Sequence, residues 1–258
     1  MSEKIQTDST ALDYRIYVHD NFAEKDIDPW VLDHLSVKPG MSVLDIGCGS
    51  GKHLFKLSSL VENGTVIGTD ISDVSLAKCQ ERIDKESHKN ITIQNIDLTQ
   101  LQENLSDKKF DRILASFSIY YTKNPEKTFN DIFNLLKPGG ILFVCGPTAI
   151  NNKAYLDVAQ EAGMTFSQEF VECSKFLNDK AKDLLNNLFG NVDVSMFENR
   201  ISFPTESTVM KYWSSTPLYD KSLESNMEKS VNKAFEKTRP FVTTKVVIGL
   251  KSIKDDPV

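Results

Sequence analysis

The sequence has little cysteine and no long hydrophobic run. No stretch of about 18 consecutive apolar residues occurs, so we expect no membrane-spanning helix and no membrane partner. The first ten residues, MSEKIQTDST, are polar and lack the apolar centre of a signal peptide. We expect this segment to be disordered.

The four cysteines, Cys48, Cys79, Cys145 and Cys173, form no CxxC pair. Their spacing fits no zinc site, so the sequence predicts no bound metal. Cys48 and Cys145 lie in apolar runs, which predicts that they are buried as small hydrophobic side chains. Cysteines used in this way indicate a reducing compartment, and the expected location is cytoplasmic.

A surplus of positive charge is also missing. The chain has 30 lysines and arginines against 36 aspartates and glutamates, which gives a net charge of −6. Proteins that bind nucleic acids usually carry a basic surface, because contacts with phosphate dominate their affinity. Nucleic acid is therefore not an expected partner. The 258 residues, 40% of them hydrophobic, suffice for one large domain or a domain with an inserted cap.

Short apolar runs alternate with helical patterns over the first half of the chain. Predicted strands span residues 42–46, 65–69, 91–96, 110–117 and 141–145. Predicted helices span residues 14–35, 52–61, 73–87 and 125–136. Short, nearly continuous apolar strands that alternate with helices predict a parallel sheet covered by helices on both faces.

The pattern changes after about residue 148. The predicted elements are two helices within 152–189 with a break near Gly163, further helices at about 205–213 and 220–237, and strands at 192–203 and 241–253. These two strands complete a set of seven. Because the last strand follows a run of helices, we expect it to pair antiparallel at the far end of the sheet.

Three glycines, Gly47, Gly49 and Gly51, lie between the first predicted strand and the helix that follows it. Glycine at such a turn lets the backbone adopt positive φ and approach a ligand closely. Ligands of open α/β sheets bind beyond the carboxyl ends of the strands, where the amides of the next helix also point. The turn is therefore the predicted ligand-binding site.

Two common phosphate-binding loops do not fit this turn. A GxxxxGK[ST] loop would need glycine at position 46 and serine or threonine at position 53, where the chain has Ile46 and His53. A dinucleotide turn would need glycine in place of Lys52. We expect His53 to be packed or solvated rather than catalytic.

The segment Val43–Gly51, VLDIGCGSG, places an acidic residue just before a GxGxG spacing. It resembles the first motif of the class I S-adenosylmethionine-dependent methyltransferases. Further marks of that family follow in order: Asp70 after the second predicted strand, Asn95-Ile96-Asp97-Leu98 after the third, Phe110-Asp111-Arg112-Ile113 in the fourth, and LLKPGGILFV from Leu135 to Val144. The resemblance covers about residues 40–146.

The resemblance implies an α/β fold with a Rossmann-like, doubly wound, mostly parallel seven-stranded sheet, an antiparallel last strand and a helical cap. Residues 36–147 and 191–258 would form the core that binds S-adenosylmethionine (SAM). Helical cap elements would lie at 148–190 and 204–238, and residues 1–35 would form an N-terminal helical lid.

The resemblance also implies SAM as cofactor and S-adenosylhomocysteine (SAH) as its product. Asp70 would accept hydrogen bonds from the ribose, and Ile71 and Leu98 would enclose the adenine. Asp97 would receive the adenine amine or else cap the next turn, and Asp45 would hold either loop amides or the methionine end. The complete predicted set is Asp45, Gly47, Cys48, Gly49, Gly51, Asp70, Ile71, Asp97, Leu98 and Ser116, with Tyr14 and Tyr17 closing over the cofactor from the N-terminal helix.

Tyr120 and Tyr121 are the predicted substrate-positioning residues. They follow the fourth predicted strand, where members of the family often carry a histidine. A tyrosine with an ordinary pKa near 10 is a poor base at neutral pH, so these side chains would orient the acceptor, or one of them would only pack. Methyl transfer from a sulfonium depends chiefly on alignment and exclusion of water.

The sequence thus predicts an enzyme, monomer or homodimer, that moves a methyl group from SAM to an oxygen, nitrogen or carbon of a small-molecule acceptor. Two alternatives stay open: a non-catalytic SAM- or SAH-binding protein, and an RNA or protein methyltransferase. The second is disfavoured because Lys123 is the only basic residue in 116–124. Aromatic residues of the cap would either line the acceptor pocket or form ordinary core; they are Tyr155, Phe166, Phe170, Phe176, Tyr212, Trp213 and Tyr219.

Overall fold

A computed structural model describes residues 9–255 of the chain. Its residues group into two compact units. The first, the helical unit, comprises the chain up to Asp26, Pro147–Ser174 and Phe197–Val247. The second, the sheet unit, comprises Ile27–Gly146, Lys175–Met196 and the chain from Ile248. Each has its own hydrophobic core, described below.

Seven strands form one sheet in the order β3-β2-β1-β4-β5-β7-β6. Their bounds are β1 Ser42–Ile46, β2 Thr65–Asp70, β3 Ile91–Asn95, β4 Phe110–Ser116, β5 Leu136–Pro147, β6 Asp193–Phe203 and β7 Phe241–Ile253. Strands β1 to β5 pair in parallel. β7 runs antiparallel to β5, because Gly139 bonds to Lys254 while Thr148 bonds to Val246. The predicted mostly parallel sheet with an antiparallel last strand is confirmed.

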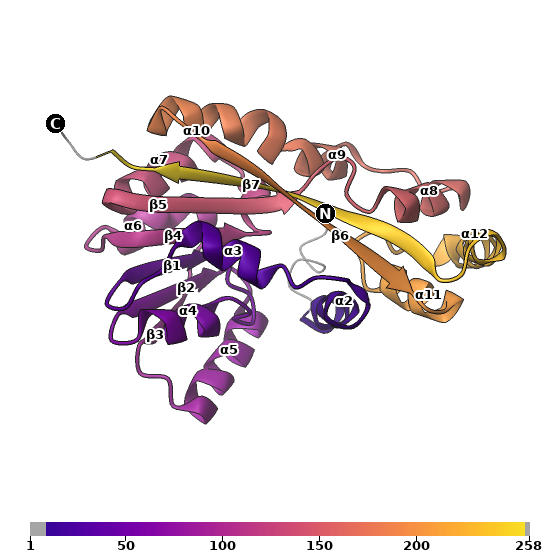
Figure 1. The fold of residues 1–258 in the computed structure, drawn as a ribbon, viewed down its shortest axis with the longest axis horizontal. Coiled ribbons are helices and arrows are strands. Elements are labelled where there is room, and N and C mark those ends of the chain that lie inside the picture. Colours follow the sequence, from indigo (N-terminus) through magenta and orange to yellow (C-terminus); the bar gives the residue numbers. More distant parts are fainter. Residues whose placement is uncertain (1–8, 256–258) are drawn as a thin grey trace. The chain divides into compact units, whose positions relative to one another are not determined.

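Helices cover both faces of the sheet within the sheet unit (Figure 1). They are α3 Asp28–Leu35, α4 Leu54–Val61, α5 Asp73–Glu86, α6 Leu101–Leu105, α7 Pro125–Leu135 and α10 Lys182–Phe189. Side chains alternate along a strand, so β1 sends Leu44 and Ile46 into a core shared with α6, α7 and α10. Asp45 lies on the opposite face, which α4 covers.

The helical unit contains α2 Ser9–Phe22, α8 Lys153–Glu161, most of α9 Gln168–Lys175, α11 Glu206–Ser214 and α12 Glu224–Lys237. Its core holds Val18 of α2, Tyr155 of α8, and Tyr212 and Trp213 of α11, all nearly inaccessible to solvent. Tyr219, by contrast, is 39% exposed. Three of the seven cap aromatics are therefore buried core residues.

The prediction of one helix over residues 14–35 is wrong. Two helices, α2 and α3, are separated by residues that pair with β6: Ala23 bridges to Ile201, and the amide of Lys25 donates to the Asn199 side chain at 3.0 Å. These partners are distant in sequence, so local periodicity could not reveal them. The predicted disorder of residues 1–8 lies outside the described residues, but Ser9 and Thr10 already belong to α2.

Two further boundaries differ from the prediction. Residues 152–189 form three helices rather than two, because α9 is joined to α10 through a π-helical turn at Leu177–Ala181. Gly163, with a φ of 96°, does follow the end of the first of them. β5 begins at Leu136 rather than 141, since Gly139 and Gly140 bond to Lys254 beyond β7. Among residues 9–255, no helix is long and apolar enough to cross a membrane.

Candidate functional site

The glycine turn follows the carboxyl end of β1, as predicted. Gly47, Gly49 and Gly51 all have positive φ, at 71°, 55° and 92°. The amides of Gly47 and Cys48 both donate to the Thr69 carbonyl, at 2.7 and 3.0 Å. The end of β2 therefore holds the turn in place.

Two of these glycines also have no room for a side chain. A Cβ on Gly47 would lie 2.2 Å from the Cβ of Ser118, and a Cβ on Gly51 would lie 2.5 Å from the Phe55 ring. Contacts this short do not occur between real atoms, so any other residue would displace its neighbour. The sequence requirement at these positions is thus both conformational and steric.

Asp70 is the last residue of β2, and both of its carboxylate oxygens contact the backbone. Oδ2 accepts the Gly49 amide at 2.8 Å, and Oδ1 accepts the Ser72 amide at 2.9 Å. Each carboxylate oxygen can accept a second hydrogen bond, so Asp70 keeps acceptor capacity for a ligand. Beside it, the side chains of Ile71 and Val74 are 55% and 53% exposed, which presents apolar surface at this edge.

Asp45 is 2% exposed and lies on β1 two residues before the turn. None of residues 9–255 makes a hydrogen bond to its Oδ2. Burial raises the pKa of Asp45 to about 6, with the nearby His53 lowering it and Asp70 raising it further. A buried carboxylate oxygen without a partner is costly, so this position favours a ligand that brings a donor.

Asp97 follows β3 and caps a 3-10 helix, Leu98–Gln100. Its Oδ1 accepts the Thr99 amide at 2.8 Å and the Thr99 hydroxyl at 2.6 Å. Hydrogen bonds from Thr99 are the main cause that lowers the pKa of Asp97 below its usual range. The capping role considered from the sequence is thus present, and Leu98 beside it is half-buried.

The end of β4 contains a strained residue that the sequence did not reveal. Phe117 has a φ of 56°, a conformation that bulky side chains rarely adopt, and its amide donates to the Cys145 carbonyl at 2.8 Å. On either side, Ser116 Oγ lies 3.3 Å from Cys145 Sγ, and Ser118 Oγ donates to the Ile46 carbonyl at 2.6 Å. Backbone strain of this kind tends to cluster at functional sites.

Tyr120 and Tyr121 form a 3-10 turn with Ile119 directly after this strand end. Their ring centroids lie 4.5 Å apart, and the Tyr120 ring packs over the backbone of Gly146, where a Cβ would lie 2.8 Å from it. Tyr121 is 36% exposed. The pair is therefore a packed ring and an accessible ring rather than two equivalent groups.

The sequence did not predict an ion-pair cluster that involves the residues directly after the glycine turn. Asp28, the first residue of α3, is 1% exposed and forms ion pairs with Lys52, His53 and Lys56, the His53 Nε2 contact being 3.2 Å. Burial would raise the pKa of Asp28, but hydrogen bonds from His53 and Lys56 lower it overall. His53 is thus packed, as expected, and it joins α3 to the start of α4.

Tyr14 and Tyr17 belong to α2 in the helical unit. Their rings stack with centroids 5.6 Å apart, and Lys211 Nζ lies 4.4 Å from the centre of the Tyr14 ring. Tyr17 is 48% exposed. Closure of these rings over a cofactor stays a prediction.

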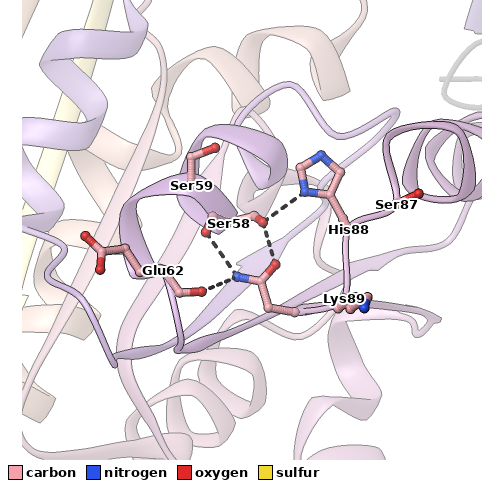
Figure 2. Close-up of a pocket in the computed structure, with 7 residues that line it drawn as sticks. Ser58, Ser59, Glu62, Ser87, His88 and Lys89 are labelled. Atoms are coloured by element: carbon pink, nitrogen blue, oxygen red, sulfur yellow. Dashed lines mark hydrogen bonds between the residues drawn. The ribbon is translucent and has the colours of Figure 1, made fainter.

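A separate pocket of about 380 Å³ lies at the opposite edge of the sheet, beside the residues that precede β2 and β3. Hydrogen bonds link its lining residues: Ser58 Oγ donates to Asn90 Oδ1 at 2.6 Å, and the Asn90 side-chain amide donates to the backbone carbonyls of Ser58 and Glu62 at 3.0 Å. These bonds connect the C-terminal end of α4 to the residue that precedes β3. Ser58, Glu62 and His88 are labelled in Figure 2. Because ligands of such sheets bind at the carboxyl ends of the strands, this pocket is not the predicted site.

The ends of the first four strands therefore bring the predicted residues of the sheet unit to one edge. Neighbouring parallel strands carry Asp45, Asp70, Asp97 and Ser116 at or near their carboxyl ends. The chain reverses its winding between β1 and β4, and this is where open α/β sheets bind ligands. A glycine cradle, a carboxylate oxygen to which no described residue donates, and exposed apolar side chains fit a cofactor with both polar and apolar parts.

Comparison with known proteins agrees with this geometry. The family profile described as "Methyltransferase domain" matches residues 37–191. Among relatives, 235L of Invertebrate iridescent virus 6, whose name assigns it as a candidate methyltransferase, is 32% identical over 166 residues, which are 62% of this chain and 58% of that protein. The chain thus spans little more than half the length of this relative.

Solved structures share the fold at low identity. The YcgJ protein of Bacillus subtilis superposes with a TM-score of 0.61 at 13% identity, covering 89% of this chain and 98% of its own. Phosphoethanolamine N-methyltransferase 2 of Haemonchus contortus, solved with phosphomonomethylethanolamine and SAH, gives 0.60 at 17% identity, covering 98% and 59%. Since the family profile matches more than half of the sequence, this chain belongs to the methyltransferase-domain family, the class I SAM-dependent methyltransferases.

Proposed function

We propose that this chain transfers the methyl group of SAM to an oxygen, nitrogen or carbon atom of a small-molecule acceptor. The observation that carries the proposal is the edge of the sheet where the glycine turn, Asp45 and Asp70 meet. SAM supplies a methyl group already activated on a sulfonium, so the protein needs mainly to align the acceptor and exclude water.

The geometry supports a distinct role for each carboxylate. The amides of Gly47 and Cys48 donate to Thr69, and that of Gly49 donates to Asp70, so these loop amides do not bind Asp45. This favours the methionine end of SAM, with its ammonium group, as the partner of Asp45. Asp70 would accept the ribose hydroxyls through its remaining acceptor capacity.

The adenine would lie between Ile71 and Leu98. Ile71 is 55% exposed beside the turn, which leaves an apolar surface available for a ring. Asp97 uses Oδ1 to cap the turn at Thr99, so its second oxygen would receive the adenine amine. Ser116 and Cys48 complete this set of cofactor contacts.

The acceptor side of the proposal involves the helical unit and, at 175–190, a segment of the sheet unit. We assign residues 148–190 and 204–238 to a cap, and the N-terminal helix to a lid in which Tyr14 and Tyr17 close over the cofactor. Tyr121, the more exposed of its pair, would orient the acceptor, while Tyr120 packs. A small-molecule acceptor, a monomeric or homodimeric protein and a cytoplasmic location are parts of the same proposal.

Calorimetry with SAH tests the assignment directly. We expect the protein to bind SAH more tightly than NADH or ATP. Asp70→Ala should weaken SAH binding at least about tenfold, because each hydrogen bond to a charged group contributes about 1.5–3 kcal/mol. Asp107→Ala, which removes a carboxylate that is 76% exposed, serves as the control and should leave the affinity unchanged.

Two outcomes would overturn the proposal. One is tighter binding of NADH than of SAH, and the other is equal SAH affinity in Asp70→Ala and wild type.

A further inference from the structure

The helical unit buries a group of polar side chains that have few partners. Arg15 lies on α2, Tyr155 on α8 and Tyr212 on α11, and Asn152 precedes α8. Tyr155 and Tyr212 are 2% and 5% exposed, and their ring centroids lie 5.4 Å apart. Polar groups this deep in a protein are normally hydrogen-bonded.

Three of these residues carry buried atoms without a hydrogen bond of normal geometry from any part of the described chain. They are the Arg15 Nε donor, the Tyr155 hydroxyl and the Asn152 Oδ1 acceptor. Thr216 lies near the Tyr155 hydroxyl, but its own hydroxyl hydrogen goes to the Trp213 carbonyl at 2.8 Å. The three atoms belong to three different segments, so the fold assembles them.

The Tyr212 hydroxyl connects this group. Burial raises the pKa of Tyr212, while the charge of Arg15 and a hydrogen bond from the Asn152 side chain oppose that rise. Asn152 thus bonds to this hydroxyl. His19, one turn after Arg15 on α2, has its ring centroid 6.5 Å from that of Tyr212, so this face of α2 packs against α11. Within residues 9–255 Arg15 forms no ion pair, in contrast to Arg239 of the same unit, which binds Glu206 at 2.6 Å.

The backbone at Asn152 fixes the position of its side chain. Asn152 has a φ of 54°, a left-handed conformation that asparagine adopts more readily than other non-glycine residues, and its amide donates to the Thr244 carbonyl at 2.8 Å. The side chain held in this way has an Oδ1 that receives no donor from residues 9–255.

We propose that Arg15, Tyr155, Tyr212 and Asn152 bind the oxyanion end, carboxylate or phosphate, of the methyl acceptor. An arginine that pairs with no carboxylate of the described chain, beside hydroxyl groups, is suited to a planar or tetrahedral oxyanion. The Asn152 oxygen adds an acceptor, so a ligand that satisfies the group carries a hydroxyl or amine next to its oxyanion. The identification of this ligand as the acceptor rests on the proposed methyl transfer.

Thermal unfolding with simple anions tests the site without knowledge of the acceptor. Lactate at about five times its dissociation constant should raise the melting temperature of the wild-type protein by roughly 2–4 °C. Propionate lacks the hydroxyl and should act more weakly, and lactamide lacks the charge and should have no effect. Phosphate in place of lactate shows which oxyanion the site prefers.

Substitutions locate the effect. Arg15→Gln and Tyr155→Phe should each abolish the shift caused by the anion. The matched controls Arg239→Gln and Tyr219→Phe alter an ion-paired arginine and an exposed tyrosine of the same unit, and they should keep it. Because the Tyr155 hydroxyl makes no hydrogen bond of normal geometry within the described residues, Tyr155→Phe should melt at the same or a higher temperature without ligand.

The inference is overturned if no anion raises the melting temperature of the wild-type protein, or if the rise persists in both Arg15→Gln and Tyr155→Phe. It is also overturned if Tyr155→Phe without ligand melts several degrees below the wild-type protein. SAH binding measured on the same preparation separates the two proposals. If the wild-type protein binds SAH but anions leave its melting temperature unchanged, only the oxyanion site is contradicted. If the wild-type protein does not bind SAH, the proposed methyl transfer is contradicted.

Discussion

Asp45 combines two properties that conflict in the ligand-free protein. Its carboxylate is buried, and no donor within residues 9–255 reaches its Oδ2. An ammonium group that arrives with a ligand would satisfy this oxygen, and it would do so best when Asp45 is ionised. A residue that costs stability in the free protein and contributes affinity in the complex is a common trade-off at binding sites.

The substitution Asp45→Asn should therefore stabilise the protein and weaken its ligand binding. An unfolded aspartate ionises near pH 4, but burial raises the pKa of Asp45 to about 6. The folded chain retains a proton that the unfolded chain has lost, so the free energy of unfolding falls as pH rises from 4 to 6 and stays lower above that range. Removing the charge should restore up to about 3 kcal/mol at pH 8, measured by denaturant unfolding.

The same variant should bind SAH about tenfold or more weakly by calorimetry, because a charged hydrogen bond contributes about 1.5–3 kcal/mol. In the wild-type protein SAH affinity should decline as pH falls below about 6. Asp33→Asn, at an exposed carboxylate, should change neither quantity. Lower stability of Asp45→Asn at pH 8, or unchanged SAH affinity, would contradict this account.

At the scale of elements, the glycine turn depends on contacts with β4 as well as on its own backbone. Gly47 has positive φ and also lies against Ser118, just beyond the end of β4. Gly190, after α10, has a φ of 76°, but a Cβ added there would have no atom within 4 Å. The two glycines thus separate the conformational requirement from the steric one.

Gly47→Ala should lower the free energy of unfolding more than Gly190→Ala. Left-handed backbone costs an alanine about 1–2 kcal/mol at either position. At Gly47 the overlap with Ser118 should add about 1–3 kcal/mol. Denaturant unfolding of both variants measures the difference, and adding Ser118→Gly to Gly47→Ala should recover part of the loss. Equal effects of the two single substitutions would show that the contact with Ser118 yields easily.

At the scale of the whole molecule, each of the two units has a hydrophobic core of its own in the part of the chain that the structure describes. The proposed cofactor contacts lie mainly in the sheet unit, whereas Tyr14, Tyr17 and the proposed oxyanion site lie in the helical unit. A ligand that binds only the folded protein at 100 times its dissociation constant adds about 2.7 kcal/mol of stability. The segments in which ligand binding slows hydrogen exchange therefore identify the unit that contacts the ligand.

Hydrogen exchange with and without SAH tests both parts of this arrangement. We expect slower exchange in Val43–Gly51 and in 70–74 and, if α2 closes as a lid, in Ser9–Phe22 as well. Peptides from α12, Glu224–Lys237, serve as the internal reference and should change least. Unchanged exchange in Val43–Gly51 would contradict the cofactor site, and unchanged exchange in Ser9–Phe22 would contradict the lid.

The sequence by itself determined the alternating order of strands and helices, the glycine turn and the carboxylates near the ends of the first three strands. These features depend on local periodicity and on spacing within short segments. β7 was also predicted from its own pattern, Phe241–Ile253. The expected burial of Cys48 and Cys145 is confirmed for the same reason, since both lie in apolar runs.

The tertiary structure decided what depends on distant partners. Residues 23–26 leave the helix because β6 offers them hydrogen bonds, and the buried Asp28 is compensated by Lys56 of α4 and by Lys52 just before it. Phe117 is strained where β4 meets the turn, and Arg15 lies beside Tyr212 only because α2 and α11 pack together. Such contacts join residues far apart in the chain, so no local pattern records them.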